Sequence, residues 1–314
     1  MRTASLLVVI PVGPGTNADF LRDTVESVLF YTGASRRLVI VDNTGAHACA
    51  NLSRDFPDVD VVTTPEVFGK RAELYLTGSW GYLWALSRFQ FDVVLRMDTD
   101  ALVIGDAPEQ DALAEFAKDP SIGALGSYLV DCNGEPRSFE AIGHQVQLEA
   151  SLLPISVNPR RYGRYLLRRF SPRGMRGFRL YRHVYREAIA NGYRPGEHFM
   201  GGAVFFSGEC IRALAGANLL YRTDLRWSRL ADDQLMSLLI ISCGMKIGDF
   251  ATGRLPMGLR WRGLPDSPEQ LVARAKKVIH STRFWKDMQE GEIRSFFRER
   301  RKRPCAPRAT SSES

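Results

Sequence analysis

The first hundred residues alternate short apolar runs with longer stretches of helical periodicity. Residues 19–30 place apolar side chains on one helical stripe, and residues 73–89 predict a second helix that leads into a strand before Asp98. Three short, β-branched runs are typical of buried parallel strands, and they lie at 6–10, 37–41 and 59–63. Strands that alternate with helices in this way predict an open α/β sheet.

The second half of the chain has a similar but less regular pattern. Residues 109–118 predict a helix, and residues 122–129 predict a strand. A Gly-Gly pair at 201–202 precedes a further apolar strand, and Asp232 and Asp233 stand at the start of an apolar helix. These elements extend the sheet with a shorter, mixed part.

The composition is that of an ordinary soluble globular protein of 314 residues, with 45% hydrophobic and 25% charged residues. The net charge of +7 favours an anionic partner, such as a nucleotide, a nucleic acid or an acidic membrane surface. No apolar run is long enough to span a bilayer, and the run at 5–10 is too short for a secretory signal. Five cysteines without a C-x-x-C pair indicate reduced thiols, so we expect a cytoplasmic protein or one peripheral at the inner face of the membrane.

Asp98 and Asp100 are two carboxylates one residue apart, and they directly follow an apolar run. Side chains at i and i+2 of a strand point the same way, so both acids leave the strand end together. Oxygen ligands of this kind suit Mg²⁺ or Mn²⁺, particularly when a substrate diphosphate completes the coordination. The alternative interpretation is that Asp-Thr-Asp caps a turn, because Asp and Thr favour turns.

Two further polar loops are expected at the same edge of the sheet. Pro11 and Val12 end the first strand, and Asp42 ends the second. In open α/β sheets ligands bind beyond the carboxyl ends of the strands, where the loop at Asp98 also lies. The sequence therefore predicts one ligand site to which three loops contribute.

Several segments together resemble the GT-A glycosyltransferases, and among them the large family-2-like group of inverting enzymes. The similarity covers residues 5–285, and the matching segments in chain order are 9–12 with 21–29, 39–43, Asp98-Thr99-Asp100 as the D-x-D motif, Met200-Gly201-Gly202-Ala203, Asp232-Asp233 and His280. Two features depart from the family. Asp42-Asn43-Thr44-Gly45 stands where Asp-Asp-Gly or Asp-Asp-Ser is often found, and the basic stretch at 158–186 has no counterpart.

The resemblance implies a GT-A (Rossmann-like) open mixed sheet flanked by helices. The composition of the basic stretch predicts, in addition, a helical insertion at 158–190. The resemblance implies one catalytic domain over 1–290, divided into a nucleotide-sugar-binding half at 1–107 and an acceptor-side half at 108–290. The remaining residues, 291–314, are expected to form a basic, disordered tail.

The resemblance also implies that Asp100 binds the metal directly, with Asp98 closer to the ribose or to the hydration shell of the metal. His280 would complete the metal shell as a neutral imidazole, although a lone histidine is as often a core or surface residue. Because Mn²⁺ accepts imidazole more readily than Mg²⁺, His280 favours manganese.

An inverting transfer needs a base that deprotonates the acceptor hydroxyl, and a carboxylate near that oxygen serves. Asp233, the second acid of the pair, is the predicted base. Asp232 is the alternative base, or it positions the acceptor. The competing interpretation is that both acids only cap the helix and stabilise its dipole.

The other predicted donor contacts come mainly from loops, and each has a structural alternative. Asp42 would accept a hydrogen bond from the nucleotide base or ribose, or else form a turn. Lys70 and Arg71 would approach the diphosphate, or else form a solvated basic turn. Glycine allows close backbone approach to a sugar or simply a tight turn. The complete set of predicted nucleotide-sugar-binding residues is Pro11, Val12, Asp42, Lys70, Arg71, Asp98, Thr99, Gly201 and Gly202.

The stretch 158–186 contains ten arginines and six aromatic residues without a single acid. It is either a solvated helical insertion or a surface that holds an anionic acceptor, such as a lipid-linked phosphate, or lies on an anionic bilayer. Nucleic acid fits the same charges, but no helix-turn-helix, zinc or RNA-binding signature accompanies them.

The sequence therefore predicts a metal-dependent inverting glycosyltransferase that uses Mn²⁺ or Mg²⁺. It would move a sugar from a nucleotide diphosphate sugar to a hydroxyl of a saccharide, lipid-linked or small-molecule acceptor. One alternative is a sugar-nucleotide pyrophosphorylase of the same fold, which wants an arginine in its phosphate loop; residues 11–16 contain none. The other is a basic protein that binds nucleic acid or membrane and whose acids are structural.

Overall fold

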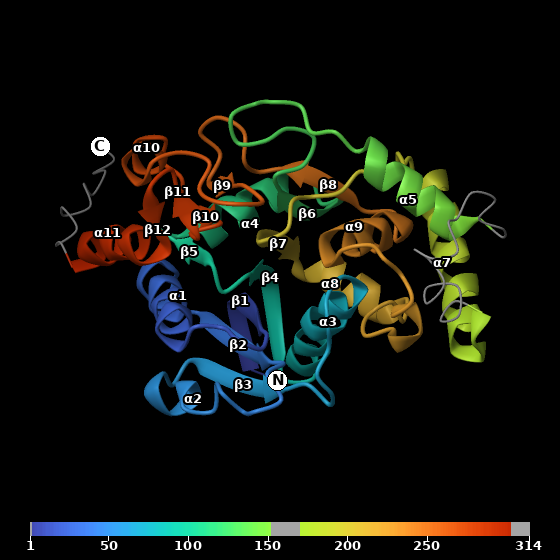
Figure 1. Ribbon diagram of the computed structural model, residues 1–314, viewed down its shortest axis with the longest axis horizontal. Coiled ribbons are helices and arrows are strands. Elements are labelled where there is room, and N and C mark those ends of the chain that lie inside the picture. The colour runs from blue at the N-terminus through green and yellow to red at the C-terminus, as the bar shows by residue number, and fades with distance from the viewer. Residues whose placement is uncertain (1, 152–169, 303–314) are drawn as a thin grey trace, which may run out of the picture.

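A computed structural model describes residues 2–151 and 170–302. Within these residues, seven strands form a central sheet in the order β3-β2-β1-β4-β7-β6-β8 (Figure 1). Strand β7 runs antiparallel to both of its neighbours, and the other adjacent strands are parallel. The strands are β1 (Arg2–Val12), β2 (Arg36–Asp42), β3 (Val59–Thr63), β4 (Phe89–Met97), β6 (Ile122–Gly126), β7 (Ala203–Ser207) and β8 (Lys246–Asp249). The predicted Rossmann-like open mixed α/β sheet flanked by helices is confirmed.

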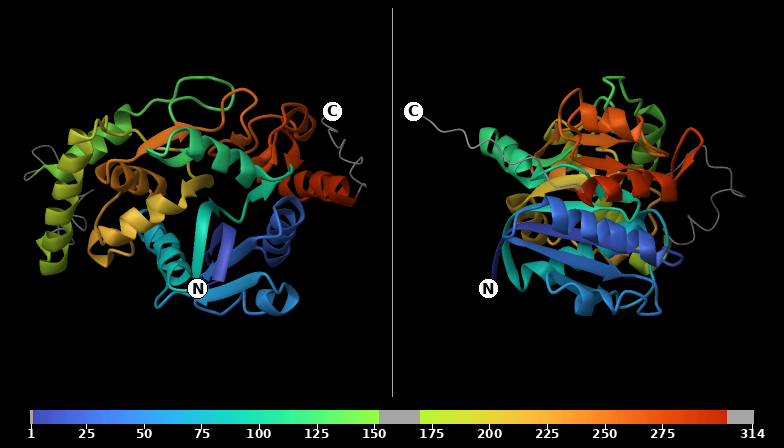
Figure 2. Two further views of the ribbon diagram at one scale, coloured as in Figure 1. Left: turned by 180° about the vertical axis from the view of Figure 1, so that it is seen from behind. Right: turned by 90° about the vertical axis from the view of Figure 1, so that its left-hand side faces the viewer.

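The apolar strands are buried on both faces of the sheet. Leu7 and Val9 of β1 point to one face and Val8 and Ile10 to the other, and none of the four is exposed. One face is covered by α3 (Ala72–Leu86), α8 (Gly208–Gly216) and α9 (Asp232–Ser242), with α5 (Glu140–Ala150) and α7 (Pro172–Ala190) outside them. The other face carries α1 (Ala18–Tyr31), α2 (Leu52–Asp55) and α4 (Pro108–Lys118) (Figures 1 and 2).

Strand order reverses beside β1, because β2 and β3 follow on one side of it and β4 lies on the other. The carboxyl ends of β1 and β4 therefore flank a topological switch point, the place where open α/β sheets bind ligands. Asp98 directly follows β4 at this edge.

A second, three-stranded sheet connects this edge to the end of the chain. It consists of β5 (Ala101–Val103), β10 (Val278–His280) and β9 (Met257–Leu259), with β10 between the other two. Because β10 pairs antiparallel with β5, His280 lies opposite Ala101. The pairing thus brings His280 next to the acids that end β4. The remaining short elements are η1 (Thr223–Leu225), α10 (Pro268–Ala273), β11 (Phe284–Trp285) and β12 (Met288–Gln289).

The predicted disordered tail begins too early. Residues 290–302 form helix α11 (Glu290–Lys302), which lies beside α1 (Figures 1 and 2). Its Ile293 and Phe297 are fully buried four residues apart, so the helix packs an apolar stripe that the basic composition concealed. Residues 303–314 lie outside the described residues.

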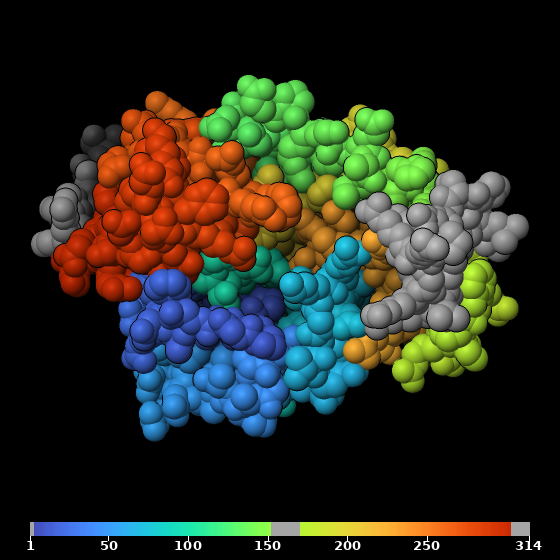
Figure 3. Space-filling view, viewed as in Figure 1, coloured from blue at the N-terminus to red at the C-terminus, as the bar shows by residue number. Residues whose placement is uncertain are grey.

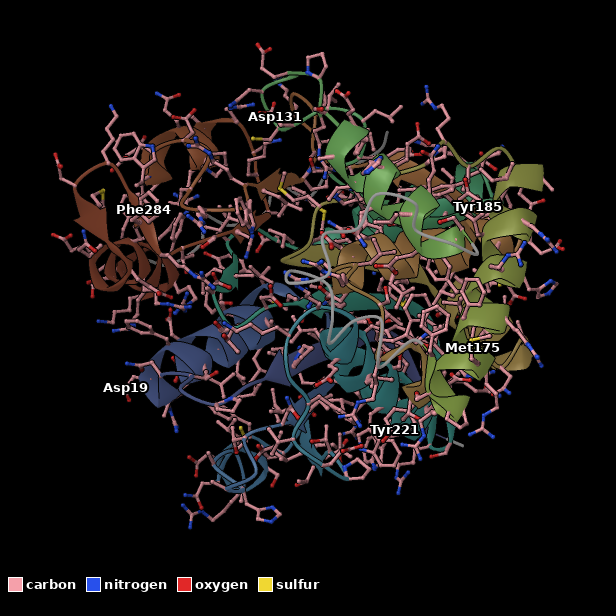
Figure 4. The ribbon with its side chains drawn as sticks, turned by 45° about the vertical axis from the view of Figure 1, so that its right-hand side comes forward. Asp19, Asp131, Met175, Tyr185, Tyr221 and Phe284 are labelled. Atoms are coloured by element: carbon pink, nitrogen blue, oxygen red, sulfur yellow. The ribbon has the colours of Figure 1, made fainter. Side chains whose placement is uncertain are left out.

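The predicted basic insertion is described only from residue 170 onward, where it forms α7. Phe178 and Tyr181 are buried on this helix, whereas Arg176, Arg179 and Arg186 are exposed. The aromatic residues of α7 therefore belong to the core and its arginines to the surface. Binding of an anionic acceptor or bilayer to that surface stays a prediction. In Figure 4 Met175 and Tyr185 of α7 lie on the opposite side of the molecule from Phe284. No helix within residues 2–151 and 170–302 is long and apolar enough to cross a bilayer.

Candidate metal centre

The turn after β4 holds the two acids of the D-x-D motif in place. The backbone N–H of Asp98 donates to the carbonyl of Gly202 at 2.7 Å, and the N–H of Ala101 donates back to the carbonyl of Asp98 at 3.1 Å. The side chain of Asp98 is 36% exposed, whereas that of Asp100 is 11% exposed. Figure 3 shows a hollow in the face of the molecule with residues near position 100 at its floor, between N-terminal and C-terminal segments.

His280 faces both acids. Its Nε2 lies 3.4 Å from Oδ1 of Asp100 and 3.8 Å from Oδ2 of Asp98, and one ligand atom from each of the three residues lies within 4.8 Å of the others. Two carboxylates and one imidazole form a donor set that Mn²⁺ accepts. The three predicted metal residues are thus brought together, and they fit a divalent cation.

Asp100 is held as a carboxylate. Ser281 Oγ donates to its Oδ2 at 2.8 Å, and Arg283 Nε lies 2.8 Å from the same oxygen. Burial opposes ionisation, but hydrogen bonds from His280 and Ser281 and the nearby positive charge of Arg283 outweigh it and lower the pKa of Asp100 well below its usual range. Asp100 is therefore ionised at any pH at which the protein would work.

Arg96 joins the two acidic pairs, a role that the sequence prediction missed. Its Nη2 lies 2.9 Å from Oδ1 of Asp98 and 2.8 Å from Oδ2 of Asp232, and the residue is buried. A basic residue inside an apolar strand, two positions before Asp98, was the available signal, because i and i+2 share a face. Through Arg96 the metal candidates and the acids of α9 form one network.

Asp233 lies next to the Gly-Gly turn. Its Oδ2 accepts the N–H of Gly201 at 2.9 Å, and its Oδ1 accepts the N–H of Gln234 at 2.9 Å. Burial and the neighbouring carboxylate of Asp232 raise the pKa of Asp233 to about 7. Asp232 is engaged by Arg96, whereas burial favours the protonated form of Asp233.

Four acids and three guanidinium groups meet in this region. The acids are Asp98, Asp100, Asp232 and Asp233, and the guanidinium groups are those of Arg96, of Arg283 and, near Asp233, of Arg137. Burial and the nearby charges of Asp232 and Asp100 raise the pKa of Asp98, although Arg96 and His280 oppose that rise.

The two glycines form a tight turn and contact protein groups, and their predicted approach to a sugar stays a prediction. Gly201 presents its N–H to Asp233, and Gly202 has a φ of +98°. A Cβ on Gly202 would lie 2.2 Å from Nδ1 of His280, so the imidazole sits directly on its α-carbon. Gly202 therefore contacts both residues: its α-carbon packs against the His280 ring, and its carbonyl accepts the N–H of Asp98.

Asp42 also differs from its predicted role. Its side chain is fully buried, with Oδ1 accepting from the N–H and the hydroxyl of Thr44 and Oδ2 accepting from the N–H of Cys49. Burial opposes ionisation of Asp42, but these hydrogen bonds prevail and lower its pKa. The turn-forming alternative holds, and Asp42 is occupied by its own loop instead of presenting a free carboxylate to a nucleotide.

The remaining predicted donor contacts lie at or near the same edge with mixed accessibility. Pro11 is half-buried and Val12 is buried, and the carbonyl of Val12 accepts the N–H of Asn43. Lys70 and Arg71 are exposed before α3, and within the described part of the chain neither forms an ion pair with the acids of the site. Thr99 contributes its backbone carbonyl to the support of the turn.

Comparison with known proteins adds little at the sequence level, since no protein-family model and no curated protein matches the chain. Among solved structures, a mannosyltransferase from Pyrobaculum calidifontis in complex with GDP-Man and Mn²⁺ is similar, with 16% sequence identity and a TM-score of 0.43. The match covers 79% of this chain and 55% of the mannosyltransferase. A likeness of this degree assigns no activity to the present chain.

Replacing Gly202 with alanine is expected to weaken Mn²⁺ binding by at least about tenfold, because the new methyl group must displace the His280 ring. Electron paramagnetic resonance of free Mn²⁺ measures the affinity. Gly216→Ala on α8 is the matched control, since a Cβ there meets no atom within 4 Å. Wild-type affinity in the Gly202→Ala protein would show that His280 is not a ligand.

Proposed function

We propose that the chain is a metal-dependent GT-A glycosyltransferase that transfers a sugar from a nucleotide diphosphate sugar to an acceptor hydroxyl with inversion. The observation that carries the proposal is a single network at the switch point of the sheet. It joins a metal-binding triad of Asp98, Asp100 and His280 to a basic carboxylate, Asp233.

A divalent cation would be held by Asp100, Asp98 and His280, and it would offset the negative charge that builds on the leaving diphosphate. The imidazole favours Mn²⁺ over Mg²⁺. Arg283 is 63% exposed, so its guanidinium can leave Asp100 and bind phosphate oxygens, as arginine does readily. Lys70, Arg71, Pro11 and Val12 remain proposed donor contacts, since they lie in the loops beside this edge.

Asp233 is the proposed general base. In the transfer, the acceptor oxygen bonds to the anomeric carbon, the bond from that carbon to the diphosphate oxygen breaks, and the acceptor proton passes to Asp233. Its hydrogen bonds to the N–H groups of Gly201 and Gln234 fix the direction of the carboxylate while leaving lone pairs for the proton. Asp232, fixed by Arg96, keeps the base and the metal triad in register.

A pyrophosphorylase is less well supported by the same geometry. In that reaction the phosphate oxygen of a sugar phosphate attacks the α-phosphorus of a nucleoside triphosphate, and pyrophosphate leaves. Because the attacking oxygen is already ionised, the reaction needs no carboxylate of raised pKa beside the metal. The loop after β1 also lacks an arginine. A saccharide, lipid-linked or small-molecule acceptor is compatible with this transferase, and so is a contact of the exposed arginines of α7 with an anionic bilayer.

The rate of transfer is expected to fall as the pH is lowered through about 7, because Asp233 acts only as the carboxylate and its pKa is about 7. Asp232 raises this pKa, and Arg96 opposes the rise; Arg137 is a further nearby cation. Values of kcat/KM measured between pH 5.5 and 8 test this prediction. On the acid side, kcat/KM should fall by a factor that approaches about tenfold for each pH unit. A rate independent of pH over that range, with donor binding constant, would contradict the assignment.

The direct test of the proposed function is a screen of nucleotide diphosphate sugars for slow hydrolysis with Mn²⁺. It identifies the donor without knowledge of the acceptor. Release of a nucleoside diphosphate by the wild-type protein but not by the Asp100→Asn variant supports a transferase, and release of none across the panel counts against it.

A further inference from the structure

Arg294 of α11 is fully buried, and it lies under the D-x-D turn. Its Nη2 donates to the carbonyl of Thr99 at 2.7 Å, and its Nη1 lies 3.0 Å from Oδ2 of Asp23. Its Nε lies 2.9 Å from Oε1 of Glu290 one turn earlier on the helix. A planar guanidinium can satisfy several acceptors in fixed directions, which a lysine ammonium cannot.

Thr99 stands between the two acidic metal candidates, so its carbonyl determines how the turn presents both of them. That carbonyl accepts from Arg294 and also from Thr24 Oγ1, at 2.9 Å. Arg294 in turn lies 3.1 Å from the same Thr24 hydroxyl. Helix α11 and helix α1 therefore fix the turn jointly from beneath.

A second path leads from Arg294 to the backbone of Asp100. Oε1 of Glu290 accepts from Arg294 and lies 3.1 Å from the hydroxyl of Thr282, whose one proton it shares with the Asp100 carbonyl. The backbone N–H and hydroxyl of Thr282 both contact the carbonyl of Asp100, at 2.9 and 3.0 Å. Arg294 thus holds the peptide carbonyl of Thr99 directly, and it is linked to the carbonyl of Asp100 through the side chains of Glu290 and Thr282.

We infer that Arg294 is a positioning residue for the metal ligands, and that α11 is an integral part of the metal site. This inference rests on the proposed function for the identity of the metal, but the contacts that carry it are independent of any bound ion. Groups that orient ligands from behind them typically change metal affinity 10- to 100-fold when altered. The alternative is that Arg294 only docks α11 onto α1 through its ion pair with Asp23.

Arg298 provides a matched control for that alternative. It lies four residues further along α11, and its Nε is 3.4 Å from Oδ1 of the same Asp23. It is 44% exposed and has no contact with the Thr99 turn among the described residues. A lysine at either position keeps one positive charge near Asp23. Only the substitution at position 294 also removes the guanidinium that contacts both Thr99 and Glu290.

The test compares Arg294→Lys with Arg298→Lys in two measurements. Free-Mn²⁺ electron paramagnetic resonance gives the metal affinity, and hydrogen exchange in metal-free protein gives the protection of residues 98–102, where the N–H of Asp98 and of Ala101 are hydrogen-bonded. We expect Arg294→Lys to weaken Mn²⁺ binding roughly tenfold and to speed this exchange. Arg298→Lys should leave both at wild-type values.

Wild-type affinity and exchange in Arg294→Lys, with at most a lower Tm, would overturn the inference, as would equal effects of Arg298→Lys. If Arg294→Lys does not fold, Glu290→Ala decides, because it removes the link to Thr282 while Arg294 stays: faster exchange at 98–102 supports the inference and unchanged exchange overturns it. Failure of the wild-type protein to bind Mn²⁺ would contradict the proposed function, whereas exchange in metal-free protein still tests the positioning role.

Discussion

Replacing Asp100 with asparagine is expected to lower Mn²⁺ affinity by at least about 100-fold and to bring transfer below detection. The loss of a residue that only orients a metal ligand already lowers metal affinity by up to about 100-fold, and the loss of a ligand should cost at least as much. Asparagine keeps the shape of the side chain but loses the charge, and the pKa of Asp100 lies well below its usual range. Its Oδ1 faces His280 at 3.4 Å, where a shared cation would lie.

Titration of Mn²⁺, followed by electron paramagnetic resonance of the free ion, measures this effect. Asp106→Asn is the matched control, because Asp106 is exposed just beyond β5 and lies outside the triad. Melting temperatures in the absence of metal separate binding from folding, since the Asp100→Asn variant would also lose the ion pair with the exposed Arg283. Equal Mn²⁺ affinity in the wild-type and Asp100→Asn proteins would rule out Asp100 as a ligand.

Replacing Asp233 with asparagine is expected to reduce kcat by about 10²- to 10⁴-fold, the usual contribution of a general base, while donor and metal binding stay unchanged. The amide cannot accept the acceptor proton, although its oxygen can still accept one of the two backbone N–H groups that hold the side chain. Transfer kinetics at saturating donor, together with calorimetric titration of the nucleoside diphosphate, separate the two effects.

Asp232→Asn distinguishes the roles of the two neighbouring acids. It removes the ion pair with Arg96 that also contacts Asp98, so we expect weaker metal and donor binding with a smaller loss of kcat. If Asp232→Asn eliminates transfer with binding intact and Asp233→Asn remains active, the two roles are reversed. Loss of donor binding in Asp233→Asn would instead place Asp233 with the metal triad.

The strands and most helices could be predicted because their signals are local. The apolar run of β1 alternates between two buried faces by the period of a strand. The two acids directly follow the apolar run of β4, although they lie in a turn and not on the strand itself. The same rule extended two residues back would have found Arg96. Placement of Asp98, Asp100 and Arg96 on one side of the strand end was therefore within reach of the sequence.

The closeness of His280 could not be derived from spacing, because it depends on a strand pairing across about 180 residues of chain. Only the resemblance to a family placed it at the metal. The role of Gly202 depends on the same pairing, since its α-carbon packs on a ring from β10. Tertiary contacts of this kind leave no periodic trace in the sequence.

Burial explains the two clearest errors. Asp42 ends a strand in the expected place, but its loop folds back and satisfies both oxygens, so its position did not predict its availability. Helix α11 has a basic sequence that favours disorder, yet Arg294 within it is a buried bridge between carboxylates and a carbonyl. Charge composition alone cannot distinguish a solvated arginine from one that is paired inside the fold.

The most direct measurement is the thermal stability of the protein with a panel of nucleoside diphosphates, with and without Mn²⁺. Ligand that binds only the folded state raises Tm by mass action. We expect at least one nucleoside diphosphate to raise Tm in the presence of Mn²⁺, no rise with chelator, and no rise in Asp100→Asn. Absence of any metal-dependent rise across the panel, or a rise that persists in Asp100→Asn, would contradict the assignment of this site to a metal-bound sugar nucleotide.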